Sequence, residues 1–289
     1  GFTLFQQSSQ LMDLSIIIAH YDPGNHPNCL DSFHKTLTNI EAQKGNHSIE
    51  IIIADDGSAS NEDVIQNSTC QINESGKIIY NLTGEKLEQW KVEKGYNYTE
   101  IRHWLYLPKT EQVMSKARIG NAATSLASSD NLLFLDDDNY FISENSIEAI
   151  LNLLKDYWLA FGQVQDSNGR YRPYTSNRVQ GTTIAVKKEV IKNAGGFGDW
   201  TEVISSAVDS DIWWKLYWYF QKNPELKACY TSQFQTVDSC SKRWKPHIKQ
   251  FFRHRAVKKE FNKIHGCPNY RNPSDNPSRI KSNWMVDLT

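Results

Sequence analysis

The sequence of 289 residues lacks several features that would assign it to a common class of protein. Its five cysteines are scattered and none lies in a C-x-x-C pair, which argues against a disulfide framework or a zinc site and favours a reducing compartment. No apolar run approaches the roughly 18 residues of a membrane span, and no signal peptide is visible. The formal net charge is −1, which gives no reason to expect nucleic acid as a partner. We therefore expect a cytoplasmic globular protein.

Apolar runs alternate with helical patterns from residue 14 onward. The runs "LSIIIAHYD" (14–22) and "IEIIIADDGS" (49–58) read as strands that are buried on both faces, with a helix over 28–43 between them. Residues 66–99 are polar and read as an insertion with one short strand at 77–82. Further strands are predicted at 100–107, 131–135 and 181–188, and further helices at 112–128, 144–158 and 210–222. This order predicts an α/β fold in which helices flank a mostly parallel, Rossmann-like sheet.

Acidic residues follow two of the predicted strands. The run "NLLFLDDDN" delivers Asp136, Asp137 and Asp138 at the end of one strand, and another strand ends in Asp55 and Asp56. Alternation along a strand points the first and third aspartates of the run the same way and the second the other way. Two such carboxylates repel each other unless a cation compensates, and Mg²⁺ and Mn²⁺ prefer oxygen ligands. Because open α/β sheets bind ligands at the carboxyl ends of their strands, the acids predict a nucleotide–metal site, with a solvated acidic loop as the alternative.

Two common nucleotide-binding signatures are missing. No G-x-G-x-x-G follows the first strand, and no Walker A sequence is present. Any phosphates would therefore be held by a metal and by basic side chains rather than by a glycine-rich loop.

The order "LSIIIAHYD … IEIIIADDGS … KARIGNAATSLASSDNLLFLDDDN … GTTIAVKKEVIKNAGGF … VDSDIWWKL" resembles the family 2 inverting glycosyltransferases of the GT-A fold. The resemblance covers residues 14–220. It implies an enzyme that uses Mn²⁺ or Mg²⁺ to move a sugar from a nucleotide-sugar donor, UDP-linked by default, to a hydroxyl of a glycan or lipid-linked acceptor, as in bacterial surface polysaccharide synthesis. The transferase domain would span 14–240, divided at residue 138 into a nucleotide-binding half and an acceptor half. An N-terminal extension (1–13) would precede it and a basic C-terminal extension (241–289) would follow.

The resemblance also implies roles for the donor-binding residues. Tyr21 would stack near the nucleobase, and Asp56 would hydrogen-bond it. Arg118, in "KARIGNAA", would lie near the diphosphate. Asp138 would be the direct metal ligand, and Asp136, the other half of the D-x-D pair, would lie nearer the ribose.

A general base is implied ahead of the aromatic helix. The family's Glu-Asp-x-Asp pattern reads V-D-S-D at 208–211, so the leading Glu is absent. By its spacing to the helix Asp209 is the base, while Asp211 is an alternative base, a supporting carboxylate or an ordinary helix-start acid. Trp200 and Trp213 are candidate acceptor contacts, although rings on every side of the helix are also typical of a fully buried one.

The C-terminal extension contains a strongly basic stretch at 242–263, with nine Lys/Arg against one acid. It could lie on an anionic membrane surface, because aromatic and aliphatic side chains alternate with its charges: Phe251, Phe252, Val257 and Phe261. It could also contact donor phosphates or a polyanionic glycan, or be a solvated helix packed on the domain. His247 or His265 is a candidate to close over the metal, and the Pro- and Asn-rich end predicts a loosely ordered tail.

Two other functions are compatible with this pattern. A sugar nucleotidyltransferase would share a related sheet, but such enzymes open with a Gly-rich, basic loop where this chain has "HYDPGNHPN". A non-catalytic nucleotide- or carbohydrate-binding module would not need the D-x-D pair together with Asp209. Turnover of a nucleotide sugar, as opposed to a nucleoside triphosphate or neither, separates the three.

Overall fold

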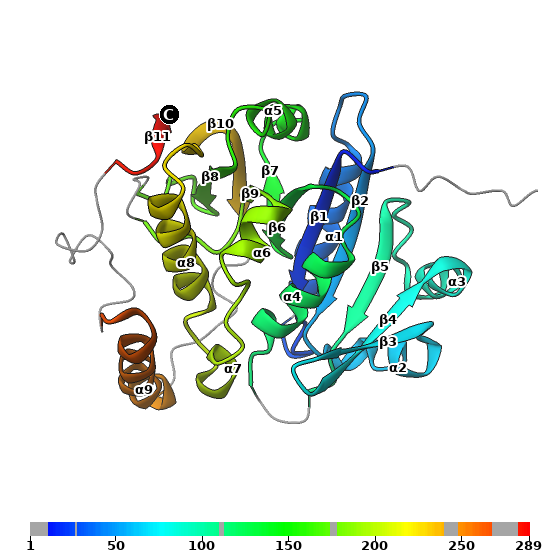
Figure 1. The fold of residues 1–289 in the computed structure, drawn as a ribbon. Helices are drawn as coiled ribbons and strands as arrows, with labels where there is room; N and C mark the ends of the chain where they lie inside the picture. The colour runs from blue at the N-terminus through cyan, green and yellow to red at the C-terminus, as the bar shows by residue number, and fades with distance from the viewer. Residues whose placement is uncertain (1–10, 27, 110–112, 174–177, 240–247, 268–282) are drawn as a thin grey trace, which may run out of the picture.

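One mixed β-sheet runs through the computed structural model, which describes residues 11–26, 28–109, 113–173, 178–239, 248–267 and 283–289. The strand order is β11-β10-β8-β9-β6-β1-β2-β5-β4-β3, and helices cover both faces (Figure 1). The centre is parallel: β1 (Leu14–His20) lies between β2 (Ile49–Asp55) and β6 (Asn131–Asp136), with β5 (Ile101–Tyr106) beyond β2. The predicted α/β fold with a mostly parallel, helix-flanked sheet is confirmed.

The central strands are mostly apolar because both of their faces are buried. Ile17 packs into the core on one side of the sheet, whereas its neighbours Ile16 and Ile18 pack into the core on the other. The first core is covered by α4 (Lys116–Leu126), α6 (Lys188–Asn193) and α8 (Val208–Lys222). The second is covered by α1 (Cys29–Glu41), α3 (Gly84–Lys94) and α5 (Ser146–Leu153).

The predicted polar insertion forms one edge of the sheet. Strands β3 (Cys70–Glu74) and β4 (Lys77–Thr83) form a hairpin that pairs antiparallel with β5. The short η1 (Ala59–Asn61) and α2 (Val64–Asn67) precede the hairpin, and α3 follows it.

The other half of the sheet contains the strand predicted at 181–188, which is β9, together with strands that the periodicity did not indicate. Strand β9 (Ile184–Lys187) is antiparallel to both β6 and β8 (Leu159–Asp166), and β10 (Ala228–Asp238) is parallel to β8. The short β7 (Asn139–Phe141) pairs with the end of β10.

The C-terminal extension continues the domain. Helix α9 (Ile248–His265) packs against α8 and the short α7 (Thr201–Ile204), with Val257 and Phe261 fully buried. Beyond it β11 (Val286–Leu288) pairs with β10 (Figure 1). Most of the predicted loose tail, residues 268–282, lies outside what the structure describes. Residues 1–10, the stretch 242–247 with His247, and the side chain of Phe251 lie outside what the structure describes. Among the described helices none is long and apolar enough to cross a membrane.

Candidate active site

The parallel register brings the predicted acidic residues to one edge of the sheet. Ala19 of β1 is aligned with Ala54 of β2 and with Asp136 of β6. The residues that follow these positions, including Tyr21 and Asp56, therefore emerge side by side at the carboxyl ends of the strands. Ligands bind at this edge in open α/β sheets.

The three consecutive aspartates have different surroundings. Asp137 is buried and accepts a hydrogen bond from the backbone N–H of Tyr21 at 3.2 Å, with its Oδ2 2.8 Å from Nδ1 of His20. Asp137 therefore joins the end of β1 to β6. Its side chain points to the face opposite Asp136, as strand alternation predicts. Asp138 is also buried, and its carbonyl accepts bonds from the backbone N–H (2.9 Å) and the hydroxyl (2.8 Å) of Ser239.

A lysine joins two of the predicted site residues. Lys116 is the first residue of α4, and its Nζ lies 3.1 Å from Oδ1 of Asp136 and 3.4 Å from Oδ1 of Asp209. Burial alone would lower the pKa of Lys116, but the two carboxylates outweigh it and raise that pKa above its ordinary value. Burial raises the pKa of Asp136, and Lys116 opposes the shift. The ends of β6, α4 and α8 thus meet at two carboxylates and one ammonium group.

The carboxylate of Asp209 fits against a glycine. A Cβ on Gly181 would come within 2.1 Å of that carboxylate, so only glycine leaves room for it. Thr182, the next residue, accepts a hydrogen bond from the backbone N–H of Asp136 at 3.0 Å. Thr183 and Ala207, at φ of 59° and 72°, occupy the left-handed region that non-glycine residues rarely adopt. Such strain is a feature of sites whose geometry the surrounding structure fixes.

A second group of residues surrounds Asp56. Its Oδ2 accepts hydrogen bonds from Nζ of Lys109 at 2.9 Å and from the backbone N–H of Ser115 at 3.0 Å. Its buried Oδ1 has no partner among the described residues. Burial raises the pKa of Asp56 to about 6, although Lys109 and Ser115 oppose the shift. Lys109 also lies 4.5 Å from the ring centroid of Tyr21, so the two predicted nucleobase contacts share one cation.

Arg118 does not join the acids. Its Nε donates to Glu202 at 2.8 Å, and one Nη donates to the carbonyls of Glu74 (2.7 Å) and Ser75 (2.8 Å) in the turn between β3 and β4. Residues two apart on a helix point in nearly opposite directions, so a helix that turns Lys116 toward the acids turns Arg118 toward the hairpin. The predicted contact of Arg118 with a diphosphate is therefore not supported by its position.

Asp211 is fully buried and both of its oxygens are occupied. Oδ2 accepts from Lys215 at 2.9 Å and from the backbone N–H of Gly198 at 3.1 Å, and Oδ1 lies 2.7 Å from Nε2 of His265. Burial would raise the pKa of Asp211, but His265 and Lys215 outweigh it and lower that pKa. The residue joins α8, α9 and the loop before α7, and His265 lies beside it instead of beside Asp138.

The two tryptophans predicted to contact an acceptor differ in exposure. Trp213 is fully buried, with its ring 6.1 Å from Tyr217 and 5.6 Å from Trp284 by centroid distance. This burial contradicts the prediction for Trp213, because no face of the ring is left for a sugar. Trp200 is only partly buried, 6.3 Å from the ring of Phe261, and its acceptor role stays a prediction.

The carboxylates at the end of β6 could supply only some of the ligands that a hard cation needs. No group of three or more His, Cys, Asp or Glu side chains in the described part of the chain is placed to hold a metal ion. Asp136 and Asp138 nevertheless supply carboxylate oxygens, and Mg²⁺-type ions commonly bind one or two carboxylates and complete their shell with substrate phosphates. The pair fits an ion that is held jointly with a phosphorylated ligand.

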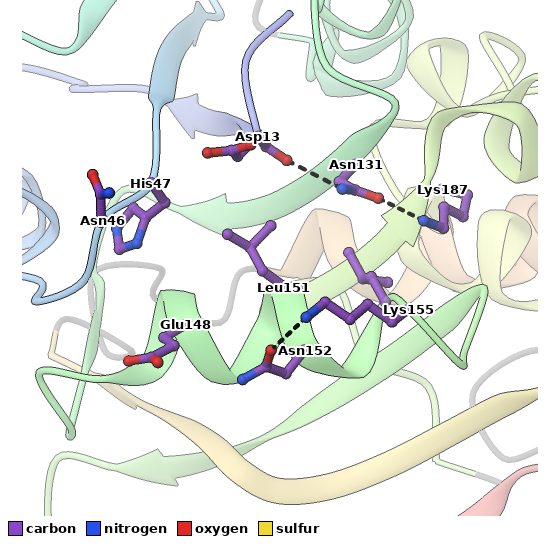
Figure 2. A pocket seen from close by; sticks show the side chains of 10 residues that line it. Asp13, Asn46, His47, Asn131, Glu148, Leu151, Asn152, Lys155 and Lys187 are labelled. Atoms are coloured by element: carbon purple, nitrogen blue, oxygen red, sulfur yellow. Dashed lines mark hydrogen bonds between the residues drawn. The ribbon is translucent and has the colours of Figure 1, made fainter.

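Two cavities lie at opposite edges of the sheet. A small cavity of about 30 Å³ lies beneath the acids and is lined by Lys116, Asp136 and Asp209. A larger one of about 490 Å³ lies at the opposite edge, where β1, β2 and β6 begin (Figure 2). There Lys187 donates to Asn131 at 2.9 Å, and Asn131 donates to the carbonyl of Asp13 at 3.1 Å. The polar groups of this larger cavity bond to one another, and the cavity lies far from the acids. The candidate site is therefore at the carboxyl ends of the strands.

Comparison with known proteins supports the fold assignment. No protein-family model and no curated protein matches the sequence. Among solved structures, S. aureus TarS 1–349 aligns with a TM-score of 0.50 and 17% identity, covering 87% of this chain and 66% of that one. The same fragment in complex with UDP-GlcNAc aligns with a TM-score of 0.50 and 16% identity over 87% and 67%. The mannosyltransferase PcManGT from Pyrobaculum calidifontis, in complex with GDP-Man and Mn²⁺, aligns with a TM-score of 0.52 and 14% identity over 92% and 68%.

The chain shares the fold of these proteins. At such low identity the likeness extends to the fold alone, and the chain spans about two thirds of the TarS fragment, 66% of its length.

Proposed function

We propose that the protein is a glycosyltransferase that uses a nucleotide-sugar donor, and that its active site lies at the carboxyl edge of the sheet. The observation that carries the proposal is the meeting of Asp136, Lys116 and Asp209 at the same edge of the sheet as Asp56, whose buried Oδ1 has no partner among the described residues. The complexes of the fold neighbours with UDP-GlcNAc and with GDP-Man and Mn²⁺ support this donor class. We further propose that the enzyme is metal-dependent, inverting and of the family 2, GT-A type.

The nucleoside would bind between Tyr21 and Asp56. Oδ1 of Asp56 is desolvated and has no partner in the described part of the chain, which is costly unless a ligand supplies a donor. A base with a ring N–H, such as uracil, would supply one, and its flat face would stack near Tyr21, whose ring Lys109 already contacts. Uridine is accordingly the proposed nucleoside.

The diphosphate would lie above the end of β6. Asp138 and Asp136 would hold Mn²⁺ or Mg²⁺, with the phosphate oxygens completing the shell. When bound, this cation would neutralise the charge that develops on the departing diphosphate. Lys116, whose raised pKa keeps it protonated, takes the phosphate-facing role that the sequence suggested for Arg118.

Asp209 would be the general base. Its side chain is 46% exposed, so an acceptor hydroxyl can reach it, whereas the carboxylate of Asp211 is enclosed. Asp209 would take the proton as the acceptor oxygen bonds to the anomeric carbon, and the bond to the diphosphate oxygen would break on the opposite face. This inverts the anomeric configuration, and a positioned base of this kind contributes about 10²–10⁴-fold.

We propose a glycan or lipid-linked glycan as the acceptor, with Trp200 as the proposed aromatic contact. The structure describes Trp200 on the loop that Asp211 fixes ahead of α8. The reaction would take place in the cytoplasm.

The experiment combines ligand binding with turnover. UDP, GDP, CDP and CMP are compared with and without Mn²⁺ by thermal shift, where a ligand at 100 times its dissociation constant adds about 2.7 kcal/mol. Slow hydrolysis of the matching nucleotide sugar is then measured. We expect Asp209→Asn to keep nucleotide binding and lose hydrolysis, while Asp199→Asn, at an exposed acid nearby, keeps both.

Two outcomes would overturn the proposal. Turnover of a nucleoside triphosphate with a sugar phosphate would identify a nucleotidyltransferase. Nucleotide binding without hydrolysis or transfer for any donor would identify a binding module.

A further inference from the structure

Helix α9 is firmly held along one side. Val257, Phe261 and His265 recur every four residues and so form a single stripe. The first two are fully buried, and the ring centroid of Phe261 lies 5.7 Å from that of Trp214. His265 is joined to the buried carboxylate of Asp211 at 2.7 Å. These contacts fix which side of the helix faces outward (Figure 1).

The outward side of α9 carries a second stripe. Phe252, Arg255, Lys259 and Lys263 follow one another at three- or four-residue spacing, and all are exposed. At 100° per residue this stripe lies opposite the buried one. Because α9 packs on the domain through its buried side, the second stripe has a fixed position on the protein surface.

The charge of this surface is strongly one-sided. The whole chain balances 32 Lys and Arg with 33 Asp and Glu. Residues 252–265 contain five Lys or Arg and one acid. The acid, Glu260, pairs with Lys263 at 3.0 Å, and the described side chains of the helix form no other ion pair with one another. The surface is therefore complementary to an anionic partner.

Exposed apolar side chains accompany the charges. Phe252 is 66% exposed in line with the basic residues. Val203 is 84% exposed on α7, which contacts α9. A helix that served only to solubilise the domain would gain nothing from these side chains, and neither would the binding of a soluble polyanion. A lipid surface uses both classes, because phosphates meet the cations and the acyl boundary accepts apolar groups.

We propose that the outer face of α9 docks the protein on an anionic lipid membrane. Arg255, Lys259 and Lys263 pair with headgroup phosphates, and Phe252 enters the acyl boundary. The association is peripheral, since none of the described helices could span a bilayer. The sequence pattern alone also offered Val257 and Phe261 to the membrane, but both are buried against the domain.

The docked helix would also position the candidate active site. His265 is joined to Asp211, which lies two residues from Asp209 on α8. The proposed base would then lie at a set height above the lipid, as a lipid-linked acceptor requires. Only this consequence rests on the proposed function; membrane docking itself does not.

The test is cosedimentation of the full chain with vesicles. We expect binding to vesicles of phosphatidylcholine and phosphatidylglycerol in equal parts, little binding to phosphatidylcholine alone, and weakening by salt. Replacing Arg255, Lys259 and Lys263 together by Gln should reduce binding about a hundredfold, at about fivefold per charge. Phe252→Ser should reduce it about tenfold. Circular dichroism checks that each variant is folded.

A matched control carries the same change of net charge elsewhere. Lys86, Lys222 and Lys227 are exposed on other elements, and their joint replacement by Gln should leave vesicle binding intact. Equal loss in both triple variants would overturn the proposal, as would binding to heparin without binding to vesicles, or no binding to either. Unchanged binding by Phe252→Ser would overturn the insertion of that ring. UDP binding by the same variants, read separately by thermal shift, should be unaffected, so failure of the membrane surface is distinguishable from failure of the proposed function.

Discussion

Asp56 should give the protein a nucleobase preference that changes near pH 6. Its Oδ2 accepts two hydrogen bonds, from Lys109 and Ser115, while Oδ1 accepts none from the described residues. A proton would therefore bind to Oδ1, the oxygen that we propose faces the base. Above the pKa this atom accepts a hydrogen bond from the ring N–H of uracil; below the pKa it becomes a donor and suits the ring nitrogen of cytosine.

The size of the effect follows from the pKa of about 6 for Asp56. One unit below that value only about a tenth of the carboxyl groups are ionised, so UDP affinity should fall about tenfold, or 1.4 kcal/mol. Affinity for CDP should rise over the same range. Because the pKa in the folded protein lies above the ordinary 3.8, the ionised group destabilises the free protein by about 3 kcal/mol, and the penalty is relieved as pH falls from 6 toward 4.

Isothermal titration with UDP and with CDP measures the nucleobase preference. The titrations run from about pH 5 to about pH 8, which brackets the pKa of Asp56 by one to two units. The ratio of the two affinities cancels titration of the diphosphate, and we expect it to shift at least tenfold toward CDP at the acid end. Asp56→Asn places an amide donor where Oδ1 stood, so this variant should show the acid-end ratio at every pH. A ratio that stays constant in the native protein, or a variant that still prefers UDP, would refute the assignment of Asp56 to the base.

Three further predictions concern other parts of the site. Gly181→Ala should lower kcat about a hundredfold because its added Cβ displaces Asp209, while nucleotide binding is kept. Gly120→Ala is the control and should be tolerated, because its added Cβ meets nothing closer than 3.4 Å. Equal kcat in the two variants would contradict the contact between Gly181 and Asp209. Asp138→Ala should abolish the gain in nucleotide affinity that Mn²⁺ provides, as seen by thermal shift, and an undiminished gain would remove this residue as a ligand. His265→Ala should lower the free energy of unfolding in urea by about 3 kcal/mol because it leaves a buried carboxylate short of a partner, and an unchanged midpoint would show that the pair adds nothing.

The central strands and the placement of the acids could be predicted from sequence because they depend on local pattern. Strands β1, β2 and β6 are mostly apolar, and parallel pairing then brings their ends to one edge. Strand alternation also separated Asp137 from its neighbours. The choice of Asp56 over Asp55 stays a prediction, but Asp55 already accepts hydrogen bonds from Ser58, Asn61 and Trp104.

The cation at the site could not be predicted from sequence. "KARIG" offers Lys116 and Arg118 two residues apart, and only the rotation of α4 about its axis decides which one faces the acids. That rotation depends on how the helix packs on the sheet, which is tertiary information. The same holds for Gly181, whose contact with Asp209 joins segments far apart in sequence.

The strand pairing of segments with a weak hydrophobic pattern could not be predicted from sequence either. Strands β8 and β10 carry mixed polar and apolar residues, and β11 is only three residues long. Each becomes a strand because a neighbouring edge is available. The aromatic content of α8 was ambiguous for a similar reason, and burial of Trp213 decided it in favour of the core.

The position of Asp137 affects how mutational scans of this region should be interpreted. Its carboxylate joins the ends of two neighbouring strands through His20 and the N–H of Tyr21, inside the protein. An alanine scan of the acidic run that recorded activity alone would rank this residue with Asp136 and Asp138 and so count three ligands where we propose two. Recording soluble yield or melting temperature beside activity would separate the strand-joining residue from the other two, since only its loss should loosen the sheet before any substrate is added.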